Sequence, residues 1–295
     1  MKALLPAVTA FKCESPIEIE ALAKALESKP FVERLPTQKQ SLGFEPFEGG
    51  EFIYAQMGAH LFQMKIQSAI LPPKVIRKEL DKQIAEIQTN ENRKLSKDEK
   101  TELQESIEFE MVQRAFNKDT VINAYFHGDM LYIGATGGNV EVVTGELRKA
   151  LGSLKIEQVA FNCALLTDWL HSYYAPPPFA FTGNVTLVGA SEDTKKEKAQ
   201  FTSMDANSDE IIASLETGKT IRSAELYMLD GNGDTSLSVT VTESTLKGIY
   251  FSNLIEDEAN GKDKAELFDS RVALTIAAIK DIFDNLKSNG VVNEG

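Results

Sequence analysis

Residues 69–83 read AILPPKVIRKELDKQ, and they mark a change in the pattern of the chain. Before them, residues 41–71 place glycine, proline and aromatic residues between short apolar runs, which is typical of antiparallel strands. After Pro72 the apolar residues recur at helical spacing, at Ile76, Leu80, Ile84 and Ile87. The sequence therefore predicts that strands give way to a helix at Pro72.

A second helix is expected after the polar break at residues 88–95. Ser96 and Glu99 have the spacing of a capping box, in which each side chain accepts a backbone N–H of the other residue. Two consecutive helices with a short connection predict a central αα-hairpin. The same capping pattern at Ser15 and Glu18 predicts an earlier helix that begins at Pro16.

The rest of the chain mixes strand-like and helix-like stretches, and the fold class expected from this mixture is α+β, with antiparallel sheets and segregated helices. A hairpin is expected at His127–Asp129, between two apolar runs. Pro176, Pro177 and Pro178 end a helical stretch. They divide the chain into a region 1–175, which holds the basic helical hairpin, and a second α+β region 176–295.

Composition excludes several classes of protein. The 295 residues include 31 Lys or Arg and 44 Asp or Glu, a formal net charge of -13, which argues against a generic nucleic-acid binder. Cys13 and Cys163 are the only cysteines, so zinc-type spacing is absent and a reducing compartment is indicated. No apolar stretch approaches the length of a membrane span. We expect a cytoplasmic protein with no membrane contact.

Motifs for catalysis or cofactors are weak. The glycine cluster at 134–139 lacks dinucleotide-binding spacing and favours a turn with a helix cap over anion binding. The stretch DGNGD at 230–234 resembles a calcium loop but lacks the closing glutamate, so a hairpin turn is favoured. The histidines, at 60, 127 and 171, are never at metal-ligand spacing. We predict no catalytic residue, no metal and no cofactor.

The basic residues cluster in one part of the chain. Residues 65–100 hold nine basic and six acidic residues, a net charge of +3, which leaves -16 for the remainder. Lys74, Lys78 and Lys82 follow one another at four-residue spacing and share one face of the expected helix. Two interpretations remain open: a solvated helix with i,i+4 ion pairs, or a face that contacts nucleic-acid phosphates without reading sequence.

These stretches also resemble a known family, the bacterial recombination-associated protein RdgC. The likeness is strongest in ILPPKVIRKELDKQIAEIQ (70–88), NRKLSKDEKTEL (92–103) and QRAF (113–116), and it continues in LRKALGSL (147–154) and LTDWL (166–170). Weaker agreement occurs at SLGFEPF (41–47) and SDEIIASLETGK (208–219). The resemblance covers most of the chain, with its specific motifs between residues 70 and 170.

The resemblance implies a nucleoid-associated DNA-binding protein without sequence preference. The family forms ring-shaped homodimers around a positively lined hole wide enough for double-stranded DNA, and it limits access of the RecA recombinase to DNA. Arg77, Arg93 and Arg114 match basic positions of that hole. Helical spacing extends the DNA-binding face to further lysines, at Lys74, Lys78, Lys82, Lys94 and Lys97.

Phe116 of QRAF matches an apolar residue at one contact of the family's dimer. The alternative for Phe116 is a core residue buried at the end of a helix. The chain departs from the family at Ala69, where a lysine is expected, and at Ser203 and Met204, where a polar, basic pair helps to close the second contact of the ring. We expect these departures to weaken ring closure or DNA affinity.

Three hypotheses follow. In the first, the chain is a non-enzymatic homodimer that encircles double-stranded DNA, with single-stranded DNA as a further partner, and modulates RecA-dependent recombination. In the second, it is a nuclease that acts on DNA ends, which would require a carboxylate cluster for Mg²⁺. In the third, its acidic surface binds recombination proteins directly.

Overall fold

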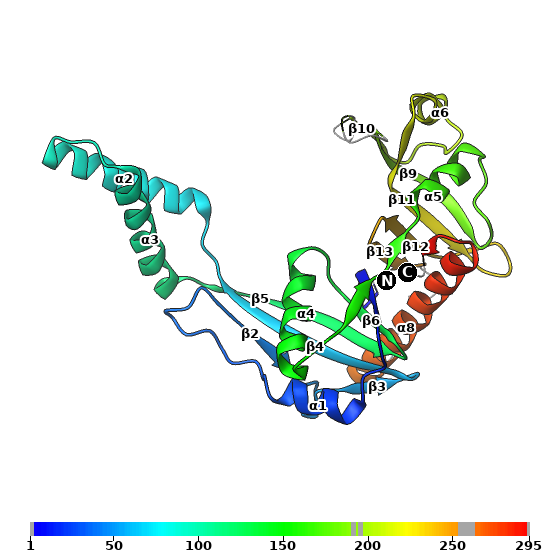
Figure 1. Cartoon of the computed structure of the whole chain (residues 1–295), viewed down its shortest axis with the longest axis horizontal. Helices are drawn as coiled ribbons and strands as arrows, with labels where there is room; N and C mark the ends of the chain where they lie inside the picture. The colour runs from blue at the N-terminus through cyan, green and yellow to red at the C-terminus, as the bar shows by residue number, and fades with distance from the viewer. Residues whose placement is uncertain (1–2, 190–192, 194–196, 253–262, 294–295) are drawn as a thin grey trace. The chain divides into compact units, whose positions relative to one another are not determined.

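The computed structural model describes residues 3–189, 193, 197–252 and 263–293. The predicted charged break at 191–198 and the end of the C-terminal tail lie largely outside these residues. Seven helices occur in the described residues: α1 Ile19–Glu27, α2 Pro73–Glu91, α3 Lys97–Arg114, α4 Gly138–Leu151, α5 Cys163–His171, α6 Asp209–Glu216 and α8 Lys264–Ser288. Figure 1 shows these helices together with the strands that they follow and precede.

The strands pair in an antiparallel manner, apart from an isolated parallel bridge between Pro30 and Phe44. They are β1 Ala7–Cys13, β2 Gln40–Glu45, β3 Tyr54–Gln56, β4 Ala59–Ala69, β5 Asn117–His127, β6 Met130–Ile133, β7 Ile156–Gln158, β8 Ala160–Phe161, β9 Phe179–Gly189, β10 Lys198–Phe201, β11 Lys219–Leu229, β12 Thr235–Thr242, β13 Leu246–Phe251 and β14 Val292–Asn293. Antiparallel sheets with segregated helices confirm the predicted α+β class.

The chain forms two compact units, each built from separate stretches. Unit 1 comprises residues 1–25, 53–62 and 123–295, and unit 2 comprises residues 26–52 and 63–122. β4 and β5 each begin in one unit and end in the other. The division at residues 175 and 176 stays a prediction.

In unit 1, eight strands follow the order β10-β9-β11-β12-β13-β1-β6-β5. Alternate residues of β12 are buried, at Leu237, Val239 and Val241, while the hydroxyl residues between them are half-exposed. This alternation is the pattern of a sheet with one face on a core. α8 packs on the sheet through Phe283, whose ring meets that of Tyr132 edge-on at 5.3 Å.

In unit 2, β2 pairs with β4 from Gln40–Ser68 to Glu45–Gln63. α2 begins after Pro72, as predicted, because proline has no backbone N–H to lose at a helix start. It ends at Glu91, and its C-cap Asn92 has a left-handed φ of 48°. α3 then begins with the predicted capping box of Ser96 and Glu99.

The other predicted capping box is wrong. α1 begins at Ile19, beyond Ser15 and Pro16. The backbone N–H of Cys13 donates to Asp129 at 2.7 Å, and that of Glu14 donates to Lys155 at 3.1 Å. These bonds keep the chain extended as far as Glu14. Residues 15–18 then form the connection to α1 and cannot be its first turn.

Candidate nucleic-acid interface

The predicted basic residues of α2 are exposed and share one face. Lys74 and Lys78 lie opposite Ile76, the buried residue of this helix, and Lys82 and Arg77 flank them, about 120° and 100° from Ile76. The separation follows from 100° per residue, which places Ile76 about 160° from Lys78. Asp81 lies on the basic face, so that face carries four cations and one carboxylate.

Three of these four cations have no carboxylate partner in the described part of the chain. Lys82 Nζ lies 4.0 Å from Glu86 Oε1, a weak i,i+4 pair of two exposed groups. Lys74, Arg77 and Lys78 form no ion pair with any described residue. One of the two interpretations left open by the sequence was a solvated helix with i,i+4 ion pairs. That interpretation fits Lys82, but it does not fit Lys74, Arg77 and Lys78.

Arg93 lies in the turn between α2 and α3 and is held by two carboxylates. Its Nε donates to Glu91 Oε2 at 2.7 Å, and its Nη1 lies 2.6 Å from Glu99 Oε1. The pKa of Glu99 is lowered, first by the backbone N–H of Ser96 and then by Arg93. Arg93 thus joins the end of α2 to the start of α3. Lys94 of the turn and Lys97, the first residue of α3, form no ion pair with a described residue.

The body of α3 is acidic. Its 18 residues include three basic and six acidic side chains, a net charge of -3. Arg114, in the last turn, is exposed and forms no ion pair with the described residues. The cationic surface is thus made by the first half of α2, the turn, and the two ends of α3, Lys97 and Arg114, while the body of α3 contributes little to it.

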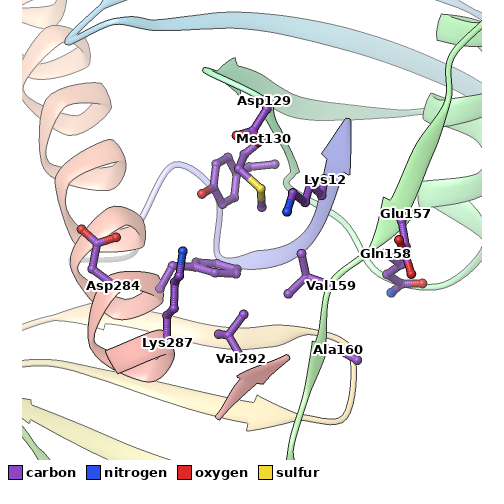
Figure 2. A pocket seen from close by; sticks show the side chains of 12 residues that line it. Lys12, Asp129, Met130, Glu157, Gln158, Val159, Ala160, Asp284, Lys287 and Val292 are labelled. Atoms are coloured by element: carbon purple, nitrogen blue, oxygen red, sulfur yellow. The ribbon is translucent and has the colours of Figure 1, made fainter. Parts of the chain in front are cut away.

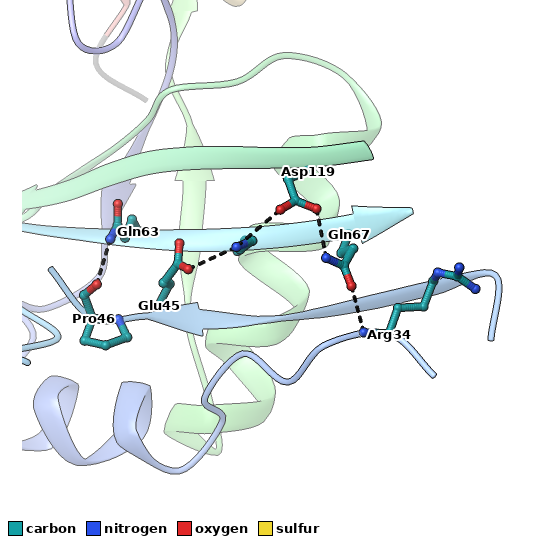
Figure 3. A network of polar contacts seen from close by, with 7 residues as sticks. Arg34, Glu45, Pro46, Gln63, Gln67 and Asp119 are labelled. Carbon is teal, nitrogen blue, oxygen red and sulfur yellow. Dashed lines mark hydrogen bonds and ion pairs between the residues drawn. The ribbon is translucent and has the colours of Figure 1, made fainter. Parts of the chain in front are cut away.

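The sequence analysis missed a polar network on the sheet of unit 2 (Figure 3). Lys65 Nζ lies 3.2 Å from Glu45 and 3.3 Å from Asp119, and 4.8 Å from the centre of the Phe31 ring. Asp119 also accepts from Gln67 at 3.0 Å, and Gln67 accepts from the backbone N–H of Arg34 at 2.8 Å. Lys65 was counted in the basic segment, but its charge is balanced within this network.

Arg34 was missed as well, because an isolated arginine in a loop gives no periodic signal. Its Nε donates to Asn117 Oδ1 at 2.9 Å, and its guanidinium also donates to the carbonyl of Gln38. Longer bonds of 3.5 Å reach the carbonyls of Val112 and Ala115 at the end of α3. Arg34 therefore fastens the loop before β2 to the end of α3, near the position of Arg114 in the sequence.

Phe116 follows Ala115, the C-cap of α3, and is 85% exposed. The alternative that it is a buried core residue is therefore wrong for the single chain. Ile70, 46% exposed, donates its backbone N–H to the Phe116 carbonyl at 2.8 Å. The two apolar residues thus lie side by side at the surface of unit 2.

The weaker motifs behave as ordinary turns. Gly137, with φ 62°, is the N-cap of α4, so the glycine cluster forms a turn and a helix start. Asp230 accepts the backbone N–H groups of Asn232 and Asp234 in the turn between β11 and β12. Within residues 3–189, 193, 197–252 and 263–293, no group of three or more His, Cys, Asp or Glu could hold a metal ion. No helix of these residues is long and apolar enough to cross a membrane.

Comparisons with known proteins agree with the resemblance inferred from the motifs. Residues 5–289 match the family described as "Putative exonuclease, RdgC". The chain is 28% identical over 281 residues to the recombination-associated protein RdgC of Shewanella loihica, covering 90% of this chain and 91% of the relative. It is 29% identical over 270 residues to the protein of the same name from Shewanella sp. strain ANA-3, covering 88% and 87%. The chain therefore belongs to the RdgC family.

Proposed function

We propose that this chain is a DNA-binding protein that contacts phosphates through the exposed cations of unit 2 and modulates recombination. The observation that carries the proposal is a set of three cations on one face at the start of α2 that form no ion pair with a described residue: Lys74, Arg77 and Lys78. Lysine and arginine on a helix surface contact backbone charge and carry no base information. The binding we propose is therefore independent of sequence.

We assign a different role to each basic residue according to whether a carboxylate already neutralises it. Lys74, Arg77, Lys78, Lys94, Lys97 and Arg114 contact phosphates directly, because no described carboxylate neutralises them. Lys82 contributes after its weak pair with Glu86 opens. Arg93 acts by fixing the turn, since two carboxylates hold it.

The assembly we propose is a homodimeric ring around double-stranded DNA, in which α2, the turn and α3 act as an αα-hairpin. Phe116 and Ile70 supply an apolar self-contact, since large exposed apolar patches mark interaction sites. The relatives are named recombination-associated proteins. We infer the same role for this chain, in the cytoplasm and on the nucleoid, through competition with a RecA-type recombinase for DNA.

The test is the salt dependence of binding to duplex DNA. Each phosphate contact contributes a slope of about -0.9 to the plot of log affinity against log salt. The variant Arg77→Glu/Lys78→Glu should bind much more weakly and show a slope smaller by about 2. Fluorescence anisotropy with two unrelated duplex sequences at several salt concentrations measures both quantities.

The matched control is Lys198→Glu/Lys247→Glu, which makes the same charge change at two exposed lysines of unit 1. It should keep the wild-type slope. If the two double variants lose affinity equally, net charge rather than the face of α2 governs binding, and the assignment is wrong.

The second candidate function is a nuclease at DNA ends, favoured by the description of the matching family as a putative exonuclease. It would need carboxylates that hold a divalent cation. Release of nucleotides from end-labelled DNA that depends on Mg²⁺ and stops with chelator would support it. Binding without release supports the non-enzymatic function.

A further inference from the structure

A cavity of about 410 Å³ lies within unit 1, a size typical of small-molecule sites. Strands β1, β6 and β7, the end of α8 and β14 surround it (Figure 2). Its lining combines apolar side chains with both signs of charge. The lining residues belong to the unit that holds none of the proposed DNA contacts, so the cavity has no part in the function proposed above.

The hydroxyl of Tyr132 is the first unusual feature of this cavity. Tyr132 is 7% exposed and lines the cavity, yet its hydroxyl has no hydrogen-bond partner in the described part of the chain. The hydroxyl is therefore open to a ligand in the cavity, and an acceptor group of that ligand can pair with it. Burial, and then the charges of Asp284 and Asp129, raise the pKa of Tyr132 well above its usual value. The phenol therefore remains protonated and donates.

Lys12 is the second donor. It pairs in register with Met130 while Ala10 pairs with Tyr132, so Lys12 and Tyr132 are diagonal neighbours on one face of the sheet. Diagonal neighbours lie about 7–8 Å apart, within reach of two long side chains. Figure 2 shows the ammonium of Lys12 directed into the cavity. It forms no ion pair with a described residue, although Glu157 lies directly opposite on β7.

Two carboxylates share the cavity with these donors. Asp129, in the β5–β6 turn, and Asp284, on α8, both line the cavity. Asp284 is paired with Lys280 of the same helix at 2.6 Å, and its charge still acts on Tyr132. A ligand that carries only negative charge would meet these two carboxylates, and a ligand that carries only positive charge would meet Lys12.

The apolar part of the lining forms a continuous wall. Phe283 meets Tyr132 edge-on at 5.3 Å and Phe161 at 5.7 Å, so its ring is held in place. Met130, Val159 and Val292 complete the wall. Such a surface binds a branched aliphatic or aromatic group.

We propose that this cavity binds a small zwitterion with an apolar body, the chemistry of an apolar α-amino acid. Its carboxylate accepts from Lys12 and the Tyr132 hydroxyl, its ammonium faces Asp129 and Asp284, and its side chain packs on Phe283. The mixed lining selects this class because each charge of the ligand meets an opposite charge and the apolar body meets the wall.

The test is isothermal titration calorimetry of the full chain with L-phenylalanine and L-leucine. Three probes each lack one part of the ligand: 3-phenylpropionate has no ammonium, phenethylamine has no carboxylate, and glycine has no apolar body. Saturable binding of either amino acid, with each probe at least about tenfold weaker, is expected. No saturable binding of both amino acids would overturn the proposal, and equal binding of 3-phenylpropionate would overturn the role of the two aspartates.

Variants identify the site. Tyr132→Phe keeps the ring and its packing and removes only the hydroxyl, and Lys12→Gln removes the ammonium. Each should weaken binding by about tenfold, because a hydrogen bond to a charged group is lost. The control Lys247→Gln changes an exposed lysine that does not line the cavity and should leave binding unchanged. Wild-type affinity in Tyr132→Phe would overturn the assignment even if the amino acid binds elsewhere.

Discussion

Unit 1 and unit 2 use apolar residues in different ways. Unit 2 has nine buried apolar residues and exposes seven large ones, Val32, Leu35, Ile70, Val75, Phe109, Phe116 and Val121. Among its described residues, unit 1 exposes the same number, but it is more than twice as long and holds the rest of the buried apolar residues that the structure describes. Burial in a core stabilises unit 1, whereas much of the apolar surface of unit 2 stays available for a partner.

The two units also differ in net charge. Unit 2 carries 14 basic and 16 acidic residues, a net charge of -2, and unit 1 carries the remaining -11. The difference teaches that a strongly acidic chain can present a cationic face, because a ligand responds to the nearby charges more than to the total. The acidic surface of unit 1 is where the third hypothesis, direct binding of recombination proteins, would act.

The largest effect expected is on the core of unit 1. Leu226→Ala removes a side chain of β11 that is 0% exposed, and it should lower the free energy of unfolding by about 2–5 kcal/mol. Leu80→Ala, on the half-buried stripe of α2, should lower it by about 1 kcal/mol or less. Urea unfolding followed by circular dichroism measures both. Equal losses would mean that α2 is packed as tightly as the sheet.

The next effect concerns self-association. Phe116→Asp places a charge where we propose an apolar contact between two copies, and it should raise the dissociation constant of the dimer by about 30-fold or more. Tyr174→Asp is the control, since Tyr174 is 59% exposed in unit 1. Analytical ultracentrifugation over a range of concentrations distinguishes the two. An unchanged dimer in Phe116→Asp would place the self-contact elsewhere.

A smaller effect distinguishes the units at high pH. Burial, and then a nearby carboxylate, raises the pKa of Cys13 and of Cys163 from 9.0 to about 11, and both thiols are in unit 1. Unfolded thiols ionise first, so the stability of the wild type is intact below about pH 9 and falls as the pH rises toward 11. Cys13→Ala/Cys163→Ala should lack this part of the fall, about 1 kcal/mol per thiol near pH 10.

The measurement for the thiols is the difference in urea midpoint between about pH 8 and about pH 10, taken for the wild type and the double variant. Comparing differences removes any constant cost of the cavities that the alanines leave. Parallel pH profiles for the two proteins would refute a contribution from the thiols.

The smallest effect is at low pH in unit 2. The hydrogen bond from Gln67, and then Lys65, lowers the pKa of Asp119. A lowered pKa contributes stability that is present above the unfolded value near 4 and is lost as the pH falls. Asp119→Asn should flatten this acid dependence only slightly, because Asp119 is 44% exposed and water screens its interactions. Glu105→Gln, an exposed carboxylate of α3 with no ion pair to a described residue, should keep the wild-type profile in the same urea series.

Much of the fold could be predicted because its signals are local. The start of α2 at Pro73, the capping box of Ser96 and the turn at Asp230 depend on residues a few positions apart. The prediction at Ser15 failed because distant backbone partners, Asp129 and Lys155, keep the chain extended there. Short strands such as β7 and β14 carried no periodic signal, since two or three residues are too few to show one.

The sequence by itself determined the charge segregation, the basic face of α2 and the family, because these depend on residue order alone. Only the three-dimensional structure decided which cations are available, since Lys65 is neutralised by Glu45 and Asp119 from distant strands, and Arg93 by Glu91 and Glu99 at the two ends of its turn. Only it placed Phe116 at the surface and left Tyr132 buried beside a cavity without a hydrogen-bond partner in the described chain. Availability and burial depend on what packs around a side chain, and packing joins residues far apart in the sequence.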